Sequence, residues 1–125
     1  MFTRPVLGLA LAAGLTLLLA VTSMASPGPS TTAKSCGISR HEMTRLGATY
    51  VTSISVTRTT CSHGKSVVRA FQRCRKARGG HGRCHHAVLG YSCSERRGYE
   101  HGEFSSRVRC HKGRRHVNFT YTQFT

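Results

Sequence analysis

Residues 61–80, CSHGKSVVRAFQRCRKARGG, contain the pattern from which we predict the central helix of the fold. Its apolar side chains recur at intervals of three and four residues: Val67, Ala70, Phe71, Cys74 and Ala77. This spacing gathers them on one side of a helix, and the pair Gly79-Gly80 just after them is a typical helix terminator. We therefore expect an amphipathic helix over residues 62–78.

The opposite side of this helix is basic. Together with the cations just beyond it, it forms the candidate binding site for anionic polymers: Lys65, Arg69, Arg73, Arg75, Lys76, Arg78 and Arg83. Guanidinium groups bind phosphate and carboxylate through paired hydrogen bonds. The one aromatic residue of the stretch, Phe71, is expected to face the core, so the pattern favours recognition of charge over base stacking. The alternative is a solvated helix face without a ligand.

Four further segments alternate apolar and polar residues as strands do, over residues 48–58, 87–93, 104–110 and 114–122. The expected core-facing residues are Ala48, Tyr50, Ile54 and Val56 in the first, Leu89, Tyr91 and Cys93 in the second, Phe104, Val108 and Cys110 in the third, and Val117, Phe119 and Tyr121 in the fourth. Residues 95–103 are expected to form a loop and residues 111–114 a tight hairpin.

These elements predict an α+β fold in which one amphipathic helix packs on an antiparallel sheet of about four strands. Ahead of them, Ser39 and Glu42 have the S-x-x-E spacing of a capping box, and Gly47 can end a helical segment that starts there. We expect a single short helical turn between Ser39 and Gly47.

The beginning of the chain has the features of a secretory signal peptide. Arg4 precedes an apolar run from Val6 to Val21, and the small residues Ser23 and Ala25 suit a cleavage site after Ala25. The run is shorter than the roughly 20 residues that span a bilayer. We therefore expect a signal peptide over 1–25, a flexible tail rich in Ser, Pro and Thr over 26–35, a single domain over 36–125, and a secreted or envelope-associated protein without a transmembrane segment, taken as a monomer.

The exported part is strongly basic. Without Arg4, 18 Lys and Arg outnumber the four Glu by 14, and the chain has no Asp. Such a charge favours encounters with anionic polymers, and their binding weakens steeply with salt. The expected partners are cell-envelope polyanions or nucleic acid.

All six cysteines lie in this exported part, where disulfides form and where a small domain depends on them. They are Cys36, Cys61, Cys74, Cys84, Cys93 and Cys110. A bridge from Cys74 to Cys84 would join the inner face of the helix to the glycine-rich loop. The other four allow three pairings: Cys36–Cys61 with Cys93–Cys110 is favoured, and a bridge from Cys61 to a sheet cysteine is the alternative.

A metal site is weighed and not expected. Cys74, Cys84, His85 and His86 are zinc-ligand residue types, but the two cysteines are ten positions apart and the two histidines are adjacent. Structural zinc sites use closely spaced pairs. The sequence predicts neither a metal nor another cofactor.

Catalysis is likewise not expected, although one enzymatic alternative remains. Without Asp, a Ser-His-Asp triad is impossible. Glu95 or Glu103 with Arg109 and His116 would supply the base, phosphate ligand and acid of a small secreted ribonuclease. A third class, a protease inhibitor or similar protein-binding module, needs an exposed rigid loop, and residues 94–103 show no reactive-site motif.

From Cys61 onward, a T-x-C-S start to the helix, GYSC, and VRCHKGRRHVNFT resemble a broad group of small secreted actinobacterial proteins of uncharacterised function. The resemblance covers about sixty residues, and Cys74 and Cys84 are additions to its pattern. It implies export, a helix on a sheet, and disulfides, and it carries no active site.

Overall fold

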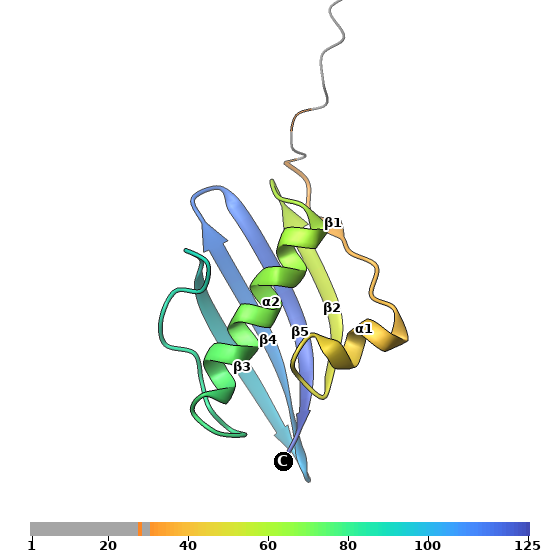
Figure 1. Cartoon of the computed structure of the whole chain (residues 1–125), viewed down its shortest axis with the longest axis vertical. Helices are drawn as coiled ribbons and strands as arrows, with labels where there is room; N and C mark the ends of the chain where they lie inside the picture. The colour runs from red at the N-terminus through yellow and green to blue at the C-terminus, as the bar shows by residue number, and fades with distance from the viewer. Residues whose placement is uncertain (1–27, 29–30) are drawn as a thin grey trace, which may run out of the picture.

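The computed structural model describes residue 28 and residues 31–125 of the chain, so the predicted signal peptide lies outside the described part. The described residues form an α+β fold of two layers, with one long helix lying across a five-stranded antiparallel sheet (Figure 1). The elements are β1 (Lys34–Ser35), α1 (Arg40–Arg45), β2 (Tyr50–Thr57), α2 (Cys61–Lys76), β3 (Ser92–Glu100), β4 (Glu103–Lys112) and β5 (Arg115–Phe124).

The strands lie in the order β1-β2-β5-β4-β3. β5 is central, because it pairs with β2 on one side and with β4 on the other. The α+β class and the long helix are confirmed, but the strand count is one too low. The extra strand is β1, whose two residues belong to the segment expected to be a flexible tail; Lys34 pairs with Val56 and Ser35 with Ser55.

The short helical turn that the sequence predicts is α1. Ser39 caps it, accepting a hydrogen bond from the Glu42 backbone, while the Glu42 carboxylate accepts one from the Ser39 backbone. This reciprocal pair is the predicted capping box. Glu42 also pairs with Lys65 Nζ at 2.8 Å, which ties α1 to α2.

β2 departs from the predicted alternation. Its register against β5 shifts between Val51 and Ser53, and this irregularity exchanges the faces of the residues before it. Val51 is therefore buried, whereas Tyr50, expected in the core, is 40% exposed and packs edge-on against Phe124 at the sheet end. Ile54 and Val56 lie in the core as predicted.

β3 lies further along the chain than the sequence predicts. Residues 95–100, expected in a loop, pair residue by residue with β4, and only His101 and Gly102 turn the chain. The expected strand start is instead a turn, closed by the bridge between Val88 and Tyr91, and Leu89 is exposed there with a φ of 49°. β3 is rich in arginine and glutamate, so its sequence lacks the alternation of apolar and polar residues from which strands are predicted. Most of the apolar side chains at this edge of the sheet come from its partner β4.

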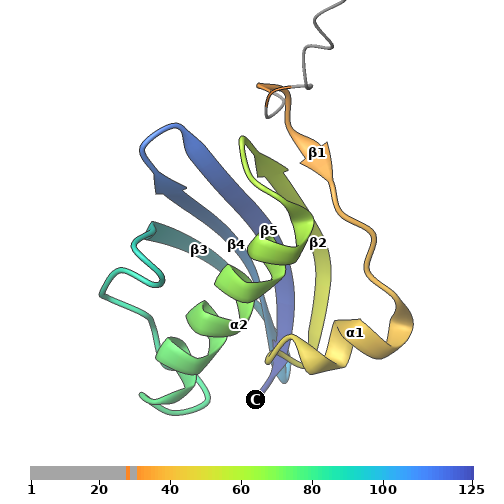
Figure 2. The same cartoon turned by 45° about the horizontal axis from the view of Figure 1, so that its top comes forward.

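The core lies between α2 and the sheet. Val67, Val68 and Phe71 on α2 meet Val108 on β4 and Phe119 on β5, and all five are nearly inaccessible to solvent. The Phe71 and Phe119 rings stand edge to face, 5.4 Å apart. The sheet curves around the helix on this inner side (Figure 2).

Three disulfides close the fold: Cys36–Cys61, Cys74–Cys84 and Cys93–Cys110. The favoured pairing is thus the one observed. Cys36–Cys61 links the segment after β1 to the start of α2, and Cys93–Cys110 joins two directly paired residues of β3 and β4. Within the described residues, no helix has the length and apolar character needed to cross a membrane.

Candidate polyanion-binding surfaces

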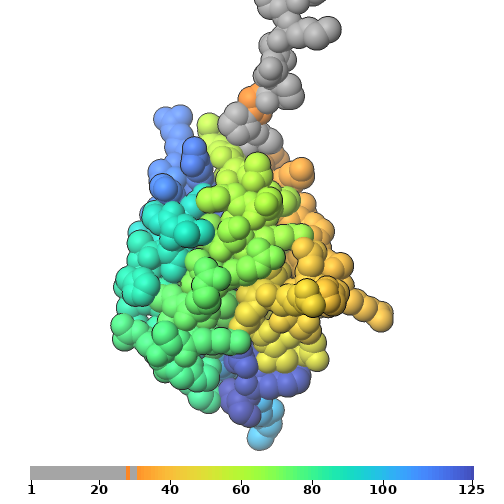
Figure 3. Space-filling view, in the orientation of Figure 1, coloured from red at the N-terminus to blue at the C-terminus, as the bar shows by residue number. Residues whose placement is uncertain are grey.

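The predicted basic stripe of α2 is present on the side of the helix away from the sheet. Arg69, Arg73 and Lys76 are exposed, and no ion pair involves them within the described residues. We call these three the helix cations. Lys65, predicted with them, is instead paired with Glu42. α2 and the segment after it form much of the face seen in Figure 3.

Arg75 is not part of this surface, which corrects the prediction. Its side chain is fully buried, at 0% exposure. It donates hydrogen bonds to Gln72 Oε1 at 2.8 Å, to the Gly80 carbonyl at 2.9 Å and to Gln123 Oε1 at 2.8 Å. Its guanidinium also lies 5.1 Å from the centre of the Tyr121 ring. Burial lowers the pKa of Arg75. Helical spacing places Arg75 over the sheet beside Phe71, so its charge is used inside the protein.

Arg78 and Arg83 flank the glycine-rich loop after α2. Arg78 is exposed, with no ion pair in the described part of the chain. Arg83 is half-exposed and lies 3.6 Å from Glu95 Oε2, so part of its charge is balanced. Of the seven predicted residues, Arg69, Arg73, Lys76 and Arg78 are therefore exposed and unpaired, Lys65 and Arg83 are paired, and Arg75 is buried.

A buried network that the sequence did not predict surrounds Glu95. The Glu95 carboxylate accepts hydrogen bonds from Arg97 Nε at 2.8 Å, from Arg97 Nη2 at 3.0 Å, from Ser106 Oγ at 2.6 Å and from the Tyr121 hydroxyl. Burial works against ionisation, but these donors outweigh it and lower the pKa of Glu95. Burial, with the bond to Glu95 as the next cause, raises the pKa of Tyr121 to about 12.

The same network anchors the glycine-rich loop. Arg97 lies with its guanidinium 4.3 Å from the centre of the Phe104 ring and donates to the carbonyls of His81 and Gly82. Arg75 donates to the carbonyl of Gly80 in the same loop. The loop is therefore fixed by two buried guanidiniums as well as by the Cys74–Cys84 bridge, and both cations serve structure.

A second cationic surface lies on the sheet face turned away from α2. On β4, Val108 and Cys110 point into the core, so Arg107 and Arg109 alternate with them and point outward. Arg96 of β3 is the direct cross-strand partner of Arg107 and shares its face. All three are exposed and, within the described residues, without an ion pair. We call them the sheet-face cations.

Hydroxyl groups continue this face onto the neighbouring strands. Thr120 on β5 pairs with Arg107, and its hydroxyl lies 2.6 Å from that of Thr52 and 2.7 Å from that of Ser53 on β2. Asn118 on β5 is the cross-strand partner of Arg109 on β4. The outer face thus combines guanidinium groups with hydroxyl and amide groups that can bind the same oxygen-rich ligand.

Two hollows lie along this face. The larger, about 490 Å³, is lined in part by Arg96, Arg107, Thr120 and Gly98, and the smaller, about 210 Å³, by Arg107, Arg109, Asn118 and Thr120. They share Arg107 and Thr120. A Cβ built at Gly98 would meet no atom within 4 Å, so the missing side chain leaves room on the sheet surface.

Sequence reasoning misses this surface because it predicts a loop over residues 95–103. The signal is nevertheless present: R-x-R at 107–109 alternates with apolar residues, which marks both arginines as outward-facing once the strand is accepted. The partner Arg96 becomes visible only with the register of β3 on β4.

The structure does not assemble the ribonuclease site. Glu95 points to the α2 side of the sheet, whereas Arg109 and His116 lie on the outer side. Glu103 shares the outer side with them, but His116 is level with His111, eight residues along β4, which is about 27 Å from Glu103. A base and an acid so far apart cannot serve one phosphodiester. The protease-inhibitor hypothesis needs an exposed rigid loop, but most of residues 94–103 are paired strand.

The comparisons with known proteins find no match among protein-family models, curated proteins or solved structures.

Proposed function

We propose that this protein is an exported cationic binding protein that recognises anionic polymers through arginine-rich surfaces. One observation carries the proposal: Arg96 and Arg107 stand directly opposite each other on an open sheet face, with Arg109 beside them and no acidic partner among the described residues. Like charges in this arrangement destabilise a sheet. A polyanion lying across the strands would remove that cost.

Export is supported by the apolar leader of the sequence and by three disulfides, which persist in oxidising compartments. The partners we propose are polymers of phosphate or acidic sugar, such as those of a cell envelope, or nucleic acid. The chemistry common to all of them is a row of oxyanions. The described surfaces offer guanidiniums for these groups, and the two aromatic residues that line the hollows, Phe119 and Tyr121, are buried in the core and not available for base stacking.

The helix cations extend the proposal to a second surface. Arg69, Arg73 and Lys76 lie on the far side of α2 from the sheet, and Arg78 comes directly after the helix. They fit the same ligand chemistry, but they come from a single helix, whereas the sheet places Arg96 directly opposite Arg107 and beside two hollows. We therefore expect the sheet face to bind more tightly.

The test is a fluorescence titration with single-stranded oligodeoxythymidylate, repeated at NaCl concentrations from about 50 to about 300 mM. The sheet-face variant is Arg96→Gln/Arg107→Gln/Arg109→Gln. The logarithm of the association constant should fall linearly with that of the salt concentration, and the variant should reduce this slope by about 2, close to 0.7 for each lost phosphate contact.

The matched control removes three charges elsewhere. Arg40→Gln/Arg45→Gln/Arg114→Gln alters exposed residues of α1 and the β4–β5 turn and leaves both surfaces intact. It should keep the slope of the unmodified protein. Equal losses in both triple variants, or an affinity that does not respond to salt, would contradict the proposal.

A further inference from the structure

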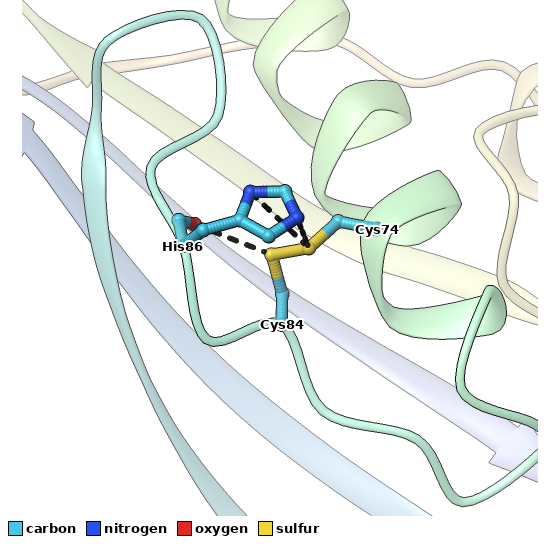
Figure 4. A group of neighbouring side chains, drawn as sticks. All are labelled: Cys74, Cys84 and His86. Carbon is cyan, nitrogen blue, oxygen red and sulfur yellow. Dashed lines mark hydrogen bonds between the residues drawn. A yellow bond between two sulfur atoms is a disulfide. The ribbon is translucent and has the colours of Figure 1, made fainter.

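A cluster of two cysteines and one histidine lies at the end of α2 and belongs to neither cationic surface. Cys74 is on the last turns of α2, and Cys84 and His86 lie on the segment that leads to β3 (Figure 4). Cys74 Sγ lies 3.3 Å from His86 Nε2. The two sulfurs and one nitrogen of His86 all lie within 4.8 Å of one another. This is the ligand set of a Cys₂His site, although the two sulfurs are joined here as a disulfide.

The imidazole of His86 is oriented as in metal-ligating histidines. Its Nδ1 lies 3.1 Å from the Ala87 carbonyl oxygen, which can only accept, so Nδ1 carries a hydrogen. With the hydrogen on Nδ1, the side of the ring that faces Cys74 is Nε2, the nitrogen available as a metal ligand. Histidine ligands in proteins commonly donate their other N–H to a backbone carbonyl in this way. The neighbouring His85 is exposed and is not a member of the cluster.

The Cys74–Cys84 bridge is also the most accessible of the three. Both its residues are partly exposed. Each of the other two bridges has one buried cysteine, which is Cys36 at 6% exposure in one and Cys110 at 1% in the other. The loop between Cys74 and Cys84 contains Gly79 and Gly80, neither of which has an atom within 4 Å of a built Cβ. A reductant therefore reaches this bridge first, and the bonds from Arg75 and Arg97 to the carbonyls of the loop remain when the bridge opens.

We propose that the Cys74–Cys84 disulfide is the oxidised form of a metal site, and that its reduction creates a Cys₂His centre for a thiophilic d¹⁰ cation, with Zn²⁺ as the test ion. A dithiol supplies two electrons and two protons: the S–S bond breaks, two thiols form, and the dithiol becomes a cyclic disulfide. Zn²⁺ then binds both sulfurs and His86 Nε2 and displaces the two thiol protons to solvent.

The geometry allows this exchange. Two sulfurs bound to one tetrahedral zinc at about 2.3 Å each lie about 3.8 Å apart. The Cα atoms of Cys74 and Cys84 are 5.2 Å apart, so side-chain rotation and a small loop movement suffice. Water or a small ligand would fill the fourth position of such a site. The ion would then replace the covalent link between α2 and the segment before β3.

The first experiment is limited reduction with dithiothreitol, and then alkylation and peptide mapping. Cys74 and Cys84 should be labelled before any other cysteine. After removal of the reductant without oxygen, competition with a chromophoric chelator should show one Zn²⁺ bound for each protein, and Co²⁺ should give thiolate charge-transfer absorption. Circular dichroism checks that the partly reduced protein stays folded.

The matched variants are His86→Ala and His85→Ala. Loss of a ligand should weaken Zn²⁺ binding at least tenfold in His86→Ala, while His85→Ala should bind as the unmodified protein does, and Cys74→Ser/Cys84→Ser should not bind. Earlier labelling of Cys36, Cys61, Cys93 or Cys110, no zinc uptake by the reduced protein, or equal affinity in both histidine variants would overturn the proposal.

Discussion

Arginine has two separate uses in this protein, and single side chains show the difference. Arg75 and Arg97 are buried, with 0% exposure of Arg75 and 1% of the Arg97 side chain, and they hold the glycine-rich loop through its carbonyls. Arg96, the neighbour of Arg97, points to the opposite side of the sheet and is exposed. Adjacent residues of one strand therefore divide between structure and proposed binding.

The Glu95 carboxylate is the group on which the buried network depends. Glu95→Gln should lower the free energy of unfolding by about 3 to 5 kcal/mol, because it leaves the Arg97 guanidinium buried without its counter-charge. Urea unfolding monitored by circular dichroism measures this. Glu100→Gln, at an exposed position of the same strand, should change stability by less than about 0.5 kcal/mol. Equal effects of the two substitutions would contradict the prediction.

Ionisation of Tyr121 should lower the stability of the folded protein at alkaline pH. Its pKa is raised to about 12 from 10.0, so the folded state binds this proton more tightly than the unfolded state does. The resulting stabilisation is fully present below pH 10 and is lost as the pH rises toward 12. A spectrophotometric titration should show a late component that belongs to Tyr121, and the urea midpoint should fall over the same range.

Tyr121→Phe is the control for that titration, since it removes the hydroxyl and keeps the ring. The late component should vanish from the absorbance, and the fall in the urea midpoint between pH 10 and 12 should become smaller. A late component that persists in Tyr121→Phe would assign it to another tyrosine.

At the scale of elements, the contact between α2 and the sheet determines where the cations point. The helix approaches the sheet closely at Gly64, where a built Cβ would lie 2.6 Å from Val56 Cγ1. This close approach fixes the rotation of α2, and hence it directs Arg69 and Arg73 to solvent and Arg75 to the core. Glycine is a poor helix former, but at position 64 the absence of a side chain lets the helix pack closely on the sheet.

Gly64→Ala tests this packing. In an open helix the change would stabilise by roughly 1 kcal/mol, but here overpacking should destabilise the protein by about 1 to 3 kcal/mol. Thermal and urea unfolding measure the difference. Gly98→Ala is the matched comparison, because nothing lies within 4 Å of its built Cβ, and it should be close to neutral. A stabilised Gly64→Ala variant would show that helix and sheet are less closely packed.

At the scale of the whole molecule, the two cationic surfaces lie on opposite sides of the fold. α2 covers one face of the sheet and turns its helix cations away from it, and the sheet-face cations lie on the other face (Figures 1 and 2). The core and the sheet separate them. If both surfaces bind, one protein molecule can hold two polymer strands at once.

Mixtures with long-chain heparin, a sulfated polysaccharide, should therefore scatter light strongly at low salt. The sheet-face variant and Arg69→Gln/Arg73→Gln/Lys76→Gln should each still bind heparin but lose most of the scattering, because each keeps only one surface. The control variant Arg40→Gln/Arg45→Gln/Arg114→Gln should scatter as the unmodified protein does. Scattering that falls equally in all three variants would reflect net charge alone.

Much of the architecture arises from local patterns. The three- and four-residue spacing of apolar side chains specifies α2, the capping box specifies α1, and alternation specifies β4 and β5, because each pattern is a property of neighbouring residues. The observed disulfide pairing is the one that the sequence favours, but the sequence also allows a bridge from Cys61 to a sheet cysteine, and the tertiary contacts decide between them.

Local patterns therefore establish the class of fold, the set of six cysteines and the sign of the charge. Which arginines are available to a ligand depends on the tertiary structure. Burial of Arg75, pairing of Arg83 with Glu95, and alignment of Arg96 with Arg107 all depend on contacts between residues far apart in the chain. Local periodicity carries no information about such contacts, because they arise only when the helix and the strands pack together.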